Sequence, residues 1–322
     1  MDGRGKPFMA KIRYKFITFR EYETEAFAEY LEYKAAKGWF LTNIHQNGIL
    51  RFEKGEPKKL NFCVAVLPGS SGLDSADNWN ARQFREYCEE AGWKLQYGGT
   101  LWQIFYTEDE ALVPIETDPE IRLENQRRIT FSWGKVLGQL FTIGLWLWML
   151  SSFIKEPGIR FSSYENIILI GFYAILILIM TGRLAGPALW FWKAERSLRK
   201  TDKFPVTTWN QVRFRNIAGG IIIIIMLAFV ICSGGKSRAI PITLLLILFI
   251  MFALYCGKIL EMVRETENTT KTGKAMIYIV ATVIVGTVAL VFFTMQIVML
   301  FPDKDTEERR YDRIAEFPSS FE

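Results

Sequence analysis

The stretch YKAAKGWFL at residues 33–41 returns in altered form as YCEEAGWKL at residues 87–95. In both copies a helical pattern runs into a glycine, and a tryptophan follows directly. Glycine commonly ends a helix because it adopts a left-handed backbone at little steric cost. The repeat therefore predicts two related units, in which Gly38 and Gly92 each close a helix and Trp39 and Trp93 each begin a strand.

The flanking sequence predicts the remaining elements of both units. In the first unit, residues 13–19 alternate like a strand, residues 21–37 have helical spacing, and three further strands follow, the last of them being LNFCVAVL. After the loop PGSSGLDSADN, the second unit has a helix at 81–91, strands at 93–98 and 101–108, and a short last strand around 112–116. Aligning Gly38 with Gly92 pairs Phe52 with Phe105 after a slip of one residue. We expect an α+β domain at residues 1–116, built from a duplicated unit of one helix over two or three antiparallel strands.

Long uncharged apolar runs fill the chain from residue 133 onward. Each approaches or exceeds the roughly 18–20 residues needed to cross a hydrocarbon core of about 30 Å. We expect an all-α multi-span membrane domain at residues 133–301, after a basic juxtamembrane linker at 117–132 and before a short disordered tail at 302–322. The five expected transmembrane helices are 133–154, 162–181, 217–233, 239–257 and 275–301. Residues 184–200 are expected to form an interfacial helix, the alternative being a continuation of the second span.

Positive charge alternates between the predicted loops. The loops after the first four spans carry two, eight, two and four Lys and Arg residues. Because basic loops are retained in the cytoplasm, this pattern predicts a cytoplasmic N-terminal domain and a C-terminus outside. The charged N-terminus also lacks the apolar stretch of a secretory signal peptide.

Composition argues against several classes of function. The net charge is +5, yet residues 1–116 hold 15 Lys and Arg against 17 Asp and Glu, a net of −2, which removes the main electrostatic reason to expect nucleic-acid binding. The single histidine, His45, precedes a hairpin turn and is expected to be solvated there. The four cysteines form no CxxC pair, and PGSSG lacks the order of a phosphate loop. We therefore expect no catalytic residues, no cofactor, no metal site and no enzymatic activity.

Two groups of residues are candidates for binding. Trp39, Trp93 and Trp102 stand at duplicated or neighbouring strand positions and would line a groove for an apolar ligand or a partner helix, the alternative being core packing. The helix at 21–37 also carries an acidic face. That face would meet a basic partner or the chain's own basic loop at 193–215, the alternative being a solvated face. The acidic residues are Glu21, Glu23, Glu25, Glu29 and Glu32.

A charged residue at mid-depth is the usual mark of a transport route, and the expected spans contain none. Their most polar side chains are Gln139, Thr243 and Gln296. We interpret these as helix-to-helix hydrogen-bonding groups.

Several motifs occur in a particular order: a helix running into Gly-Trp, then FEKGEP at 52–57, a second helix running into AGW, and WQIFY at 102–106. With several spans behind them, these residues resemble the DUF2812 family of bacterial membrane proteins over roughly residues 11–110. The resemblance implies a plasma-membrane protein, mostly of Gram-positive bacteria, often accompanied by a PadR-type transcriptional regulator, and it implies no catalytic residues. We expect a non-enzymatic protein whose cytoplasmic domain senses a ligand or recruits a protein partner. The alternative is a transporter or export-accessory component, with a lipid-modifying enzyme third.

Overall fold

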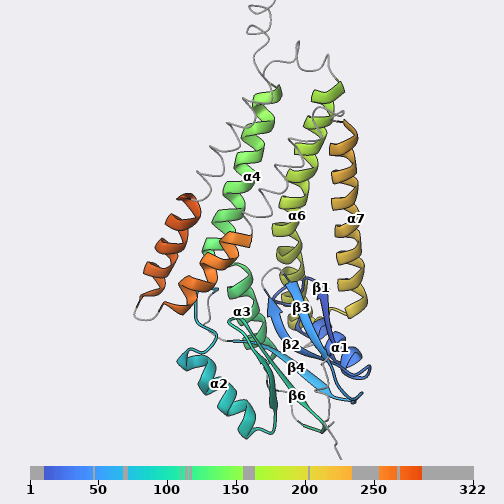
Figure 1. The fold of residues 1–322 in the computed structure, drawn as a ribbon, viewed down its shortest axis with the longest axis vertical. Helices are drawn as coiled ribbons and strands as arrows, with labels where there is room; N and C mark the ends of the chain where they lie inside the picture. Colours follow the sequence, from blue (N-terminus) through green and yellow to red (C-terminus); the bar gives the residue numbers. More distant parts are fainter. Residues whose placement is uncertain are drawn as a thin grey trace, which may run out of the picture. The chain divides into compact units, whose positions relative to one another are not determined.

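The computed structural model describes most of the chain in two compact units, Met1–Met226 and Leu227–Glu322. The first unit contains an α+β part and the helices that follow it (Figure 1). The described residues are 11–45, 48–67, 72–109, 111–112, 115, 118–154, 164–201, 204–233, 254–266 and 269–284.

The α+β part repeats one topology. The first repeat consists of β1 (Ile12–Phe16), α1 (Thr24–Ala35), β2 (Trp39–His45) and β3 (Ile49–Lys54), and the second of β4 (Asn61–Val66), α2 (Trp79–Glu90), β5 (Lys94–Gly98) and β6 (Trp102–Thr107). Their sheets have the orders β1-β3-β2 and β4-β6-β5, with every pair antiparallel. The predicted α+β class is confirmed. One assignment was wrong, because the strand of LNFCVAVL pairs with β6 and so opens the second repeat instead of completing the first.

Both sheets carry a bulge at the same point of the repeat. The register shifts after the pair Leu41 and Phe52 in the first sheet and after the pair Leu95 and Phe105 in the second. A bulge adds a residue to one strand and sharpens its twist. The predicted alignment of Phe52 with Phe105 is thereby confirmed.

The two predicted helix-closing glycines have left-handed backbones. Gly38 has a φ of 71° and Gly92 a φ of 93°. Each amide donates to the carbonyl three residues earlier, Gly38 to Ala35 at 2.9 Å and Gly92 to Glu89 at 3.0 Å. Trp39 or Trp93 then leads the chain back over its helix.

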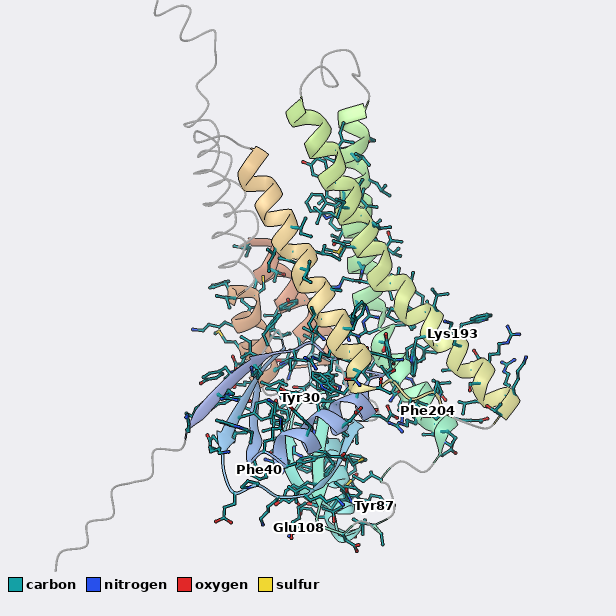
Figure 2. The ribbon with its side chains drawn as sticks, turned by 90° about the vertical axis from the view of Figure 1, so that its right-hand side faces the viewer. Tyr30, Phe40, Tyr87, Glu108, Lys193 and Phe204 are labelled. Carbon is teal, nitrogen blue, oxygen red and sulfur yellow. The ribbon has the colours of Figure 1, made fainter. Side chains whose placement is uncertain are left out.

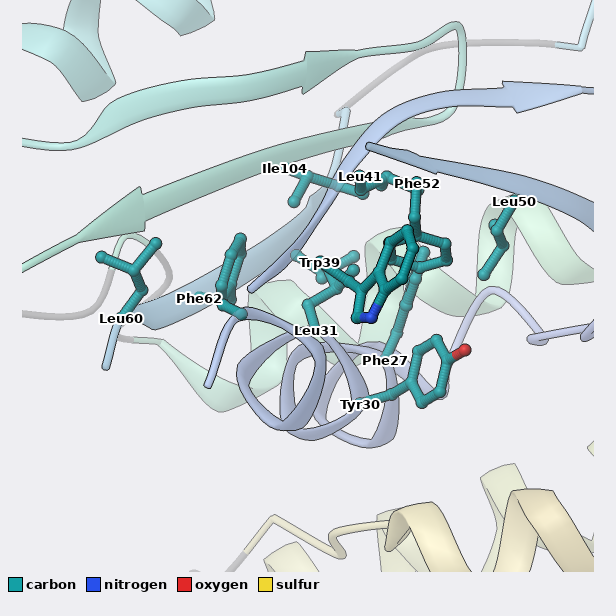
Figure 3. Close-up of a cluster of buried hydrophobic side chains, with 12 residues drawn as sticks. Phe27, Tyr30, Leu31, Trp39, Leu41, Leu50, Phe52, Leu60, Phe62 and Ile104 are labelled. Carbon is teal, nitrogen blue, oxygen red and sulfur yellow. The ribbon is translucent and has the colours of Figure 1, made fainter. Parts of the chain in front are cut away.

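Helix α1 packs on both sheets. Its buried Phe27, Tyr30 and Leu31 share one core with Leu41 and Phe52 of the first sheet (Figure 3). Phe62, Val64 and Ile104 of the second sheet belong to the same core. Phe105 points to the opposite face of the second sheet, where α2 contributes Cys88. The second sheet is thus covered on both faces, whereas the first sheet is covered by α1 on one.

The predicted linker at 117–132 contains a helix, α3 (Pro119–Thr130). The Asp118 side chain caps it by accepting from the amides of Glu120 at 2.9 Å and Ile121 at 3.2 Å. Proline suits the first turn because an amide there would have no partner within the helix. Arginines suit the last turn because their positive charge interacts favourably with the negative end of the helix dipole.

Three long helices follow: α4 (Trp133–Ile154), α6 (Tyr164–Thr201) and α7 (Trp209–Ser233), whose residues from Leu227 onward belong to the second unit. Helix α4 covers the same residues as the first expected span. The predicted break between a second span and a separate interfacial helix was wrong, because α6 runs through Pro187 without interruption for 38 residues. Trp190 and Phe191, just after Pro187 in α6, pack on Tyr22 and Phe131. These contacts stabilise the helix where proline removes one hydrogen bond.

One helix among the described residues is long and apolar enough to cross a membrane. It is the stretch Tyr173–Thr201 of α6, with a mean hydropathy of 1.7 and 11% of its most apolar window buried. In the second unit, residues 254–265 and 271–284 are helical. The remainder of the expected fourth and fifth spans and the tail at 302–322 lie outside the described residues.

Candidate functional site at the first turn of helix α1

The three predicted tryptophans are divided between two hydrophobic clusters. Trp39, with 8% exposure, belongs to the core around α1, and Trp102 packs edge-on to Phe27 in that core with ring centroids 5.2 Å apart. Trp93 belongs to the separate cluster under α2. These positions fit the core-packing alternative. Two hollows on the surface of α2 and between α3 and α6 are lined by other side chains.

Trp39 and Trp102 differ in how their ring edges and faces are used. Arg13 lies over the Trp39 ring at 4.4 Å and Lys54 at 5.2 Å, an arrangement that an indole favours more than a phenyl ring does. The Trp102 Nε1 is buried without a hydrogen-bond partner among the described residues.

We therefore expect Trp102→Phe to change the free energy of unfolding by about 1 kcal/mol or less, because the lost volume is offset by removal of an unsatisfied donor. Trp39→Phe should cost about 1–2 kcal/mol through lost packing and two weakened cation–π contacts. Thermal unfolding of both variants checks the order. A Trp102→Phe loss larger than that of Trp39→Phe would contradict it.

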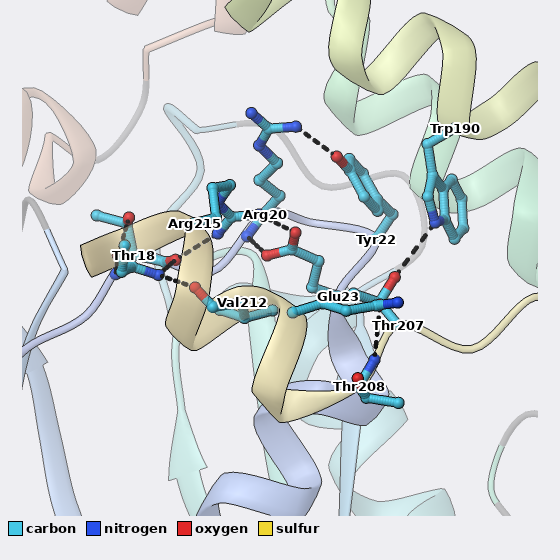
Figure 4. Close-up of polar contacts among 11 residues, drawn as sticks. Thr18, Arg20, Tyr22, Glu23, Trp190, Thr207, Thr208, Val212 and Arg215 are labelled. Carbon is cyan, nitrogen blue, oxygen red and sulfur yellow. Dashed lines mark hydrogen bonds and ion pairs between the residues drawn. The ribbon is translucent and has the colours of Figure 1, made fainter. Parts of the chain in front are cut away.

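The acidic face of α1 makes the more specific arrangement. The backbone amide of Arg20 donates to the Glu23 carboxylate at 2.9 Å just before the helix begins. That carboxylate, with 3% side-chain exposure, also forms an ion pair with Arg215 of α7 (Figure 4). A charge buried to this degree is stable only when it is paired and hydrogen-bonded. Glu23 therefore ties the start of α1 to α7 across 192 positions of sequence.

The chain just before α1 is held by the same part of α7. Asn216 accepts from the Thr18 amide at 3.0 Å and from the Thr18 hydroxyl at 2.8 Å. Its own amide group donates to the Thr18 carbonyl at 3.1 Å, and Arg215 donates to that carbonyl at 2.8 Å. Two α7 side chains thus satisfy the backbone of a residue that belongs to no strand or helix.

Helix α3 binds the other side of the turn. Arg122 forms an ion pair with Glu25 and donates to the Thr24 hydroxyl at 2.6 Å. The buried Gln126 donates to the same hydroxyl at 3.3 Å. At the start of α4, Lys135 contacts the Glu21 carboxylate at 2.5 Å.

One further carboxylate of α1 receives the N-terminus of α7. The backbone amide of Trp209, the first residue of α7, donates to Glu29 at 2.8 Å. A carboxylate there complements the positive end of the helix dipole. The Trp209 ring lies 4.4 Å from that of Tyr30. A polar and an apolar contact therefore fix the same helix end.

Aromatic stacking extends this junction to α6. The Tyr22 ring stacks on Trp190 with centroids 4.4 Å apart, and the Trp190 indole donates to Thr207 at 3.2 Å. Burial raises the pKa of Tyr22, against the opposing effect of the hydrogen bond from Arg20. Below, the acidic junction means Glu21, Glu23, Glu25 and Glu29 together with Lys135, Arg215, Arg122 and the Trp209 amide.

The solvated-face alternative for this acidic helix was wrong for these residues, and the basic segment at 193–215 does supply partners in Arg215 and Trp209. The contributions of Arg122 and Lys135 were missed. The sequence showed an acidic helix in one segment and an excess of Lys and Arg in others. This predicts that ion pairs can form between them but not which residues pair.

Glu32, one turn further along, is held differently. Burial raises its pKa from the ordinary 4.5, the Phe62 amide that donates to it at 3.2 Å lowers it, and the charge of Glu29 raises it. Above pH 4.5 the folded state therefore retains more proton than the unfolded state, so stability falls as pH rises through the raised pKa.

We expect Glu32→Gln to flatten that fall and to be at least as stable as the parent protein near neutral pH, because glutamine keeps an acceptor for Phe62 without the buried charge. Thermal unfolding between about pH 4 and pH 8 measures this. Glu86→Gln, at the exposed equivalent position of the second repeat, is the control. A parallel pH profile for Glu32→Gln and the parent would contradict the expectation.

Two surface hollows lie outside the junction. One of about 530 Å³ lies on α2 beside Phe84 and Tyr87, and one of about 330 Å³ lies between α3 and α6 beside Phe131 and Phe191. No group of three His, Cys, Asp or Glu suited to a metal occurs among the described residues.

A known family model matches most of the α+β part. Residues 21–137 match the family model described as a protein of unknown function, DUF2812. Residues 21–137 are called the DUF2812 region from here on. The match begins at Glu21 and ends just past Lys135, so this ion pair and the Arg122 contacts lie within the DUF2812 region, whereas Arg215 of α7 lies outside it. No curated protein and no solved structure matches the chain.

Proposed function

We propose that this protein is a non-enzymatic, multi-pass protein of the bacterial plasma membrane whose cytoplasmic DUF2812 region senses a ligand or recruits a protein partner. In this proposal the acidic junction couples the state of the membrane helices to helix α1. The observation that carries it is the ion pair between the buried Glu23 and Arg215 of α7.

The chemistry of that pair suits a coupling element. Removing one partner leaves a buried uncompensated charge, so the undocked state of the turn must expose Glu23 to water. A docked and an exposed arrangement are then separated by a few kcal/mol, which is the range in which a second event can shift populations. A tilt or displacement of α7 at Arg215 would act directly on the first turn of α1.

The membrane placement is supported by α6 and by the outward apolar side chains of α4 and α7. Trp133, Phe141 and Trp148 of α4 and Ile223 and Ile224 of α7 are all well exposed. Apolar surface on this scale is typical of a contact with lipid or protein. The polar contact that is described between α4 and α6, from Gln139 to the Met180 carbonyl at 2.7 Å, fits a helix-packing hydrogen bond.

The charge alternation of the loops supports a cytoplasmic DUF2812 region, with a C-terminus outside. A functional association with a PadR-type regulator is part of the proposal and comes from the family resemblance. The partner of the DUF2812 region would then report the state of the membrane helices inside the cell.

Hydrogen exchange on the full-length protein tests the coupling. The protein is placed in nanodiscs of two acyl-chain lengths, and the exchange of peptides covering α1 is compared. We expect the first turn of α1 to exchange differently in the two bilayers, and this difference to disappear in Arg215→Gln. Identical exchange in both bilayers for the parent protein would contradict the coupling, and substrate-dependent flux in vesicles would favour the transporter alternative.

A further inference from the structure

The two repeats differ in how their sheets are covered. The second sheet packs against α1 through Phe62 and Ile104 and against α2 through Phe105. The first sheet is covered by α1 on one face and contacts the second sheet through β2 and β5. Its other face has no covering helix among the described residues. This face is called the outer face below.

The outer face carries exposed apolar side chains. Ile12, Tyr14 and Phe16 of β1 are 46%, 58% and 69% exposed, and Ile49 of β3 is 37% exposed. Phe16 pairs with Ile49, which in turn pairs with His45. The Tyr14 and His45 rings have centroids 6.3 Å apart. An aromatic and aliphatic row therefore follows the edge strand of the sheet.

Basic side chains alternate with this row. Arg13 and Lys15 pair with Phe52 and Leu50, so they project from the other face of β1, next to α1. Burial lowers the pKa of Lys34 on α1, and repulsion by Lys15 and Arg13 lowers it further. Several positive charges are thus crowded along one edge, and the exposed Lys11 extends the row.

The end of β1 is fixed beside the base of α7. Thr18, two residues after Phe16, is held by Asn216 through three hydrogen bonds. From Ile217 onward α7 has an outward apolar surface, with Ile221 51% and Ile223 65% exposed. Phe16 therefore lies near the level at which α7 changes from arginine and asparagine to isoleucine.

We infer that the outer face and basic edge of β1 form a contact site for an anionic phospholipid surface, with Phe16 and Tyr14 entering the headgroup region and Lys11 and Lys15 near the lipid phosphates. The inference rests on the proposed membrane anchoring through α7. Aromatic side chains favour the interface between hydrocarbon and water, and long basic side chains reach headgroups from beside it. Each Lys or Arg near an anionic surface strengthens association about fivefold.

This contact would give the DUF2812 region a second attachment to the bilayer. The segment between β1 and α1 contains both Thr18 and Glu23. A displacement of β1 would therefore be transmitted to the acidic junction. Lipid composition would then affect the position of α1 through the first sheet as well as through α7.

A fluorescent amino acid placed by itself at position 16, 87 or 223 of the full-length protein tests the site. Tyr87 is 64% exposed on α2 and lies in the α+β part at a distance from α7 (Figure 2), and Ile223 is 65% exposed on the apolar part of α7. The protein is placed in nanodiscs of phosphatidylcholine with or without phosphatidylglycerol, and quenching by lipids brominated near the headgroup is measured.

We expect loss of fluorescence at positions 16 and 223 and none at 87, with the loss at 16 greater when phosphatidylglycerol is present. Lys11→Gln with Lys15→Gln should reduce the loss at 16 and leave that at 223 unchanged. Quenching at 223 without quenching at 16 overturns the lipid site and leaves the anchoring proposal standing. Quenching at neither position overturns both, and equal quenching at 16 and 87 shows unspecific adsorption and also overturns the site.

Discussion

Arg215→Ala is expected to increase hydrogen exchange in the first turn of α1 by roughly 100-fold. The change removes the cation that pairs with Glu23, whose side chain is 3% exposed in the parent protein, while the hydrogen bond from the Arg20 amide remains. Breaking a buried ion pair from one side costs about 3–5 kcal/mol. We take about 3 kcal/mol, because Arg215 itself keeps 31% exposure, and each 1.4 kcal/mol corresponds to a factor of ten.

The matched control is Arg213→Ala. Arg213 precedes Arg215 by two residues on the same helix, and its side chain is exposed. Removing an exposed cation typically changes stability by no more than about 0.5 kcal/mol. Hydrogen exchange of peptides covering residues 21–30, followed by mass spectrometry on the full-length protein, measures both variants. Equal effects of the two changes would show that the loss reflects general charge on α7.

Gly38→Ala is expected to be far more damaging than Gly92→Ala, although the two glycines occupy the same place in the repeat. Both have left-handed backbones, which disfavour alanine by about 1–2 kcal/mol. A Cβ on Gly38 would lie 2.5 Å from the Gly55 carbonyl oxygen, a backbone atom that cannot turn away. On Gly92 the nearest atom is a methyl group of Leu112 at 3.3 Å.

The added overpacking at Gly38 should cost about 1–3 kcal/mol beyond the backbone strain, giving a total of about 2–5 kcal/mol against about 1–2 kcal/mol for Gly92. Gly55 also donates to the Gly38 carbonyl at 2.9 Å, so a shift of either strand end breaks that bond. Unfolding temperatures of the two alanine variants, with expression levels recorded, check this order. A Gly92→Ala loss as large as that of Gly38→Ala would contradict it.

Local sequence patterns were enough to predict the repeat. Helix spacing followed by Gly-Trp predicted where α1 and α2 end and that β2 begins at Trp39. The position of β4 was misjudged, because a strand's partner is set by long-range pairing and LNFCVAVL follows the first repeat directly. Helix α3 had a readable start in Asp118 and Pro119, a cap followed by a first-turn proline.

Two features depended on tertiary contacts that no local pattern contains. The short apolar piece around Pro187, with its paired tryptophans and basic end, indicated a separate interfacial helix. Packing against Tyr22 and Phe131 instead accompanies a continuous helix there. In the acidic junction, Glu21 meets Lys135 and Glu23 meets Arg215 across 114 and 192 positions. Counting charges showed that the acidic helix face and the basic segments could pair, but many Lys and Arg residues were equally available.

The tryptophans show the opposite case. Their duplication was a real signal, but it marked a repeated structural role, since each follows a helix-closing glycine and packs in its own cluster. Burial of a large aromatic side chain contributes to stability in each copy, which fits this structural role.

The central claim is that Glu23 and Arg215 join α1 to α7, and a double-mutant cycle tests it most directly. Glu23→Gln, Arg215→Gln and the combined variant are compared with the parent protein by hydrogen exchange of the first turn of α1 in one bilayer. We expect the combined variant to lose less stability than the sum of the two single losses, with a coupling energy of about 1–3 kcal/mol. Additive effects within about 0.5 kcal/mol would show that the pair does not hold the junction together and would contradict the account.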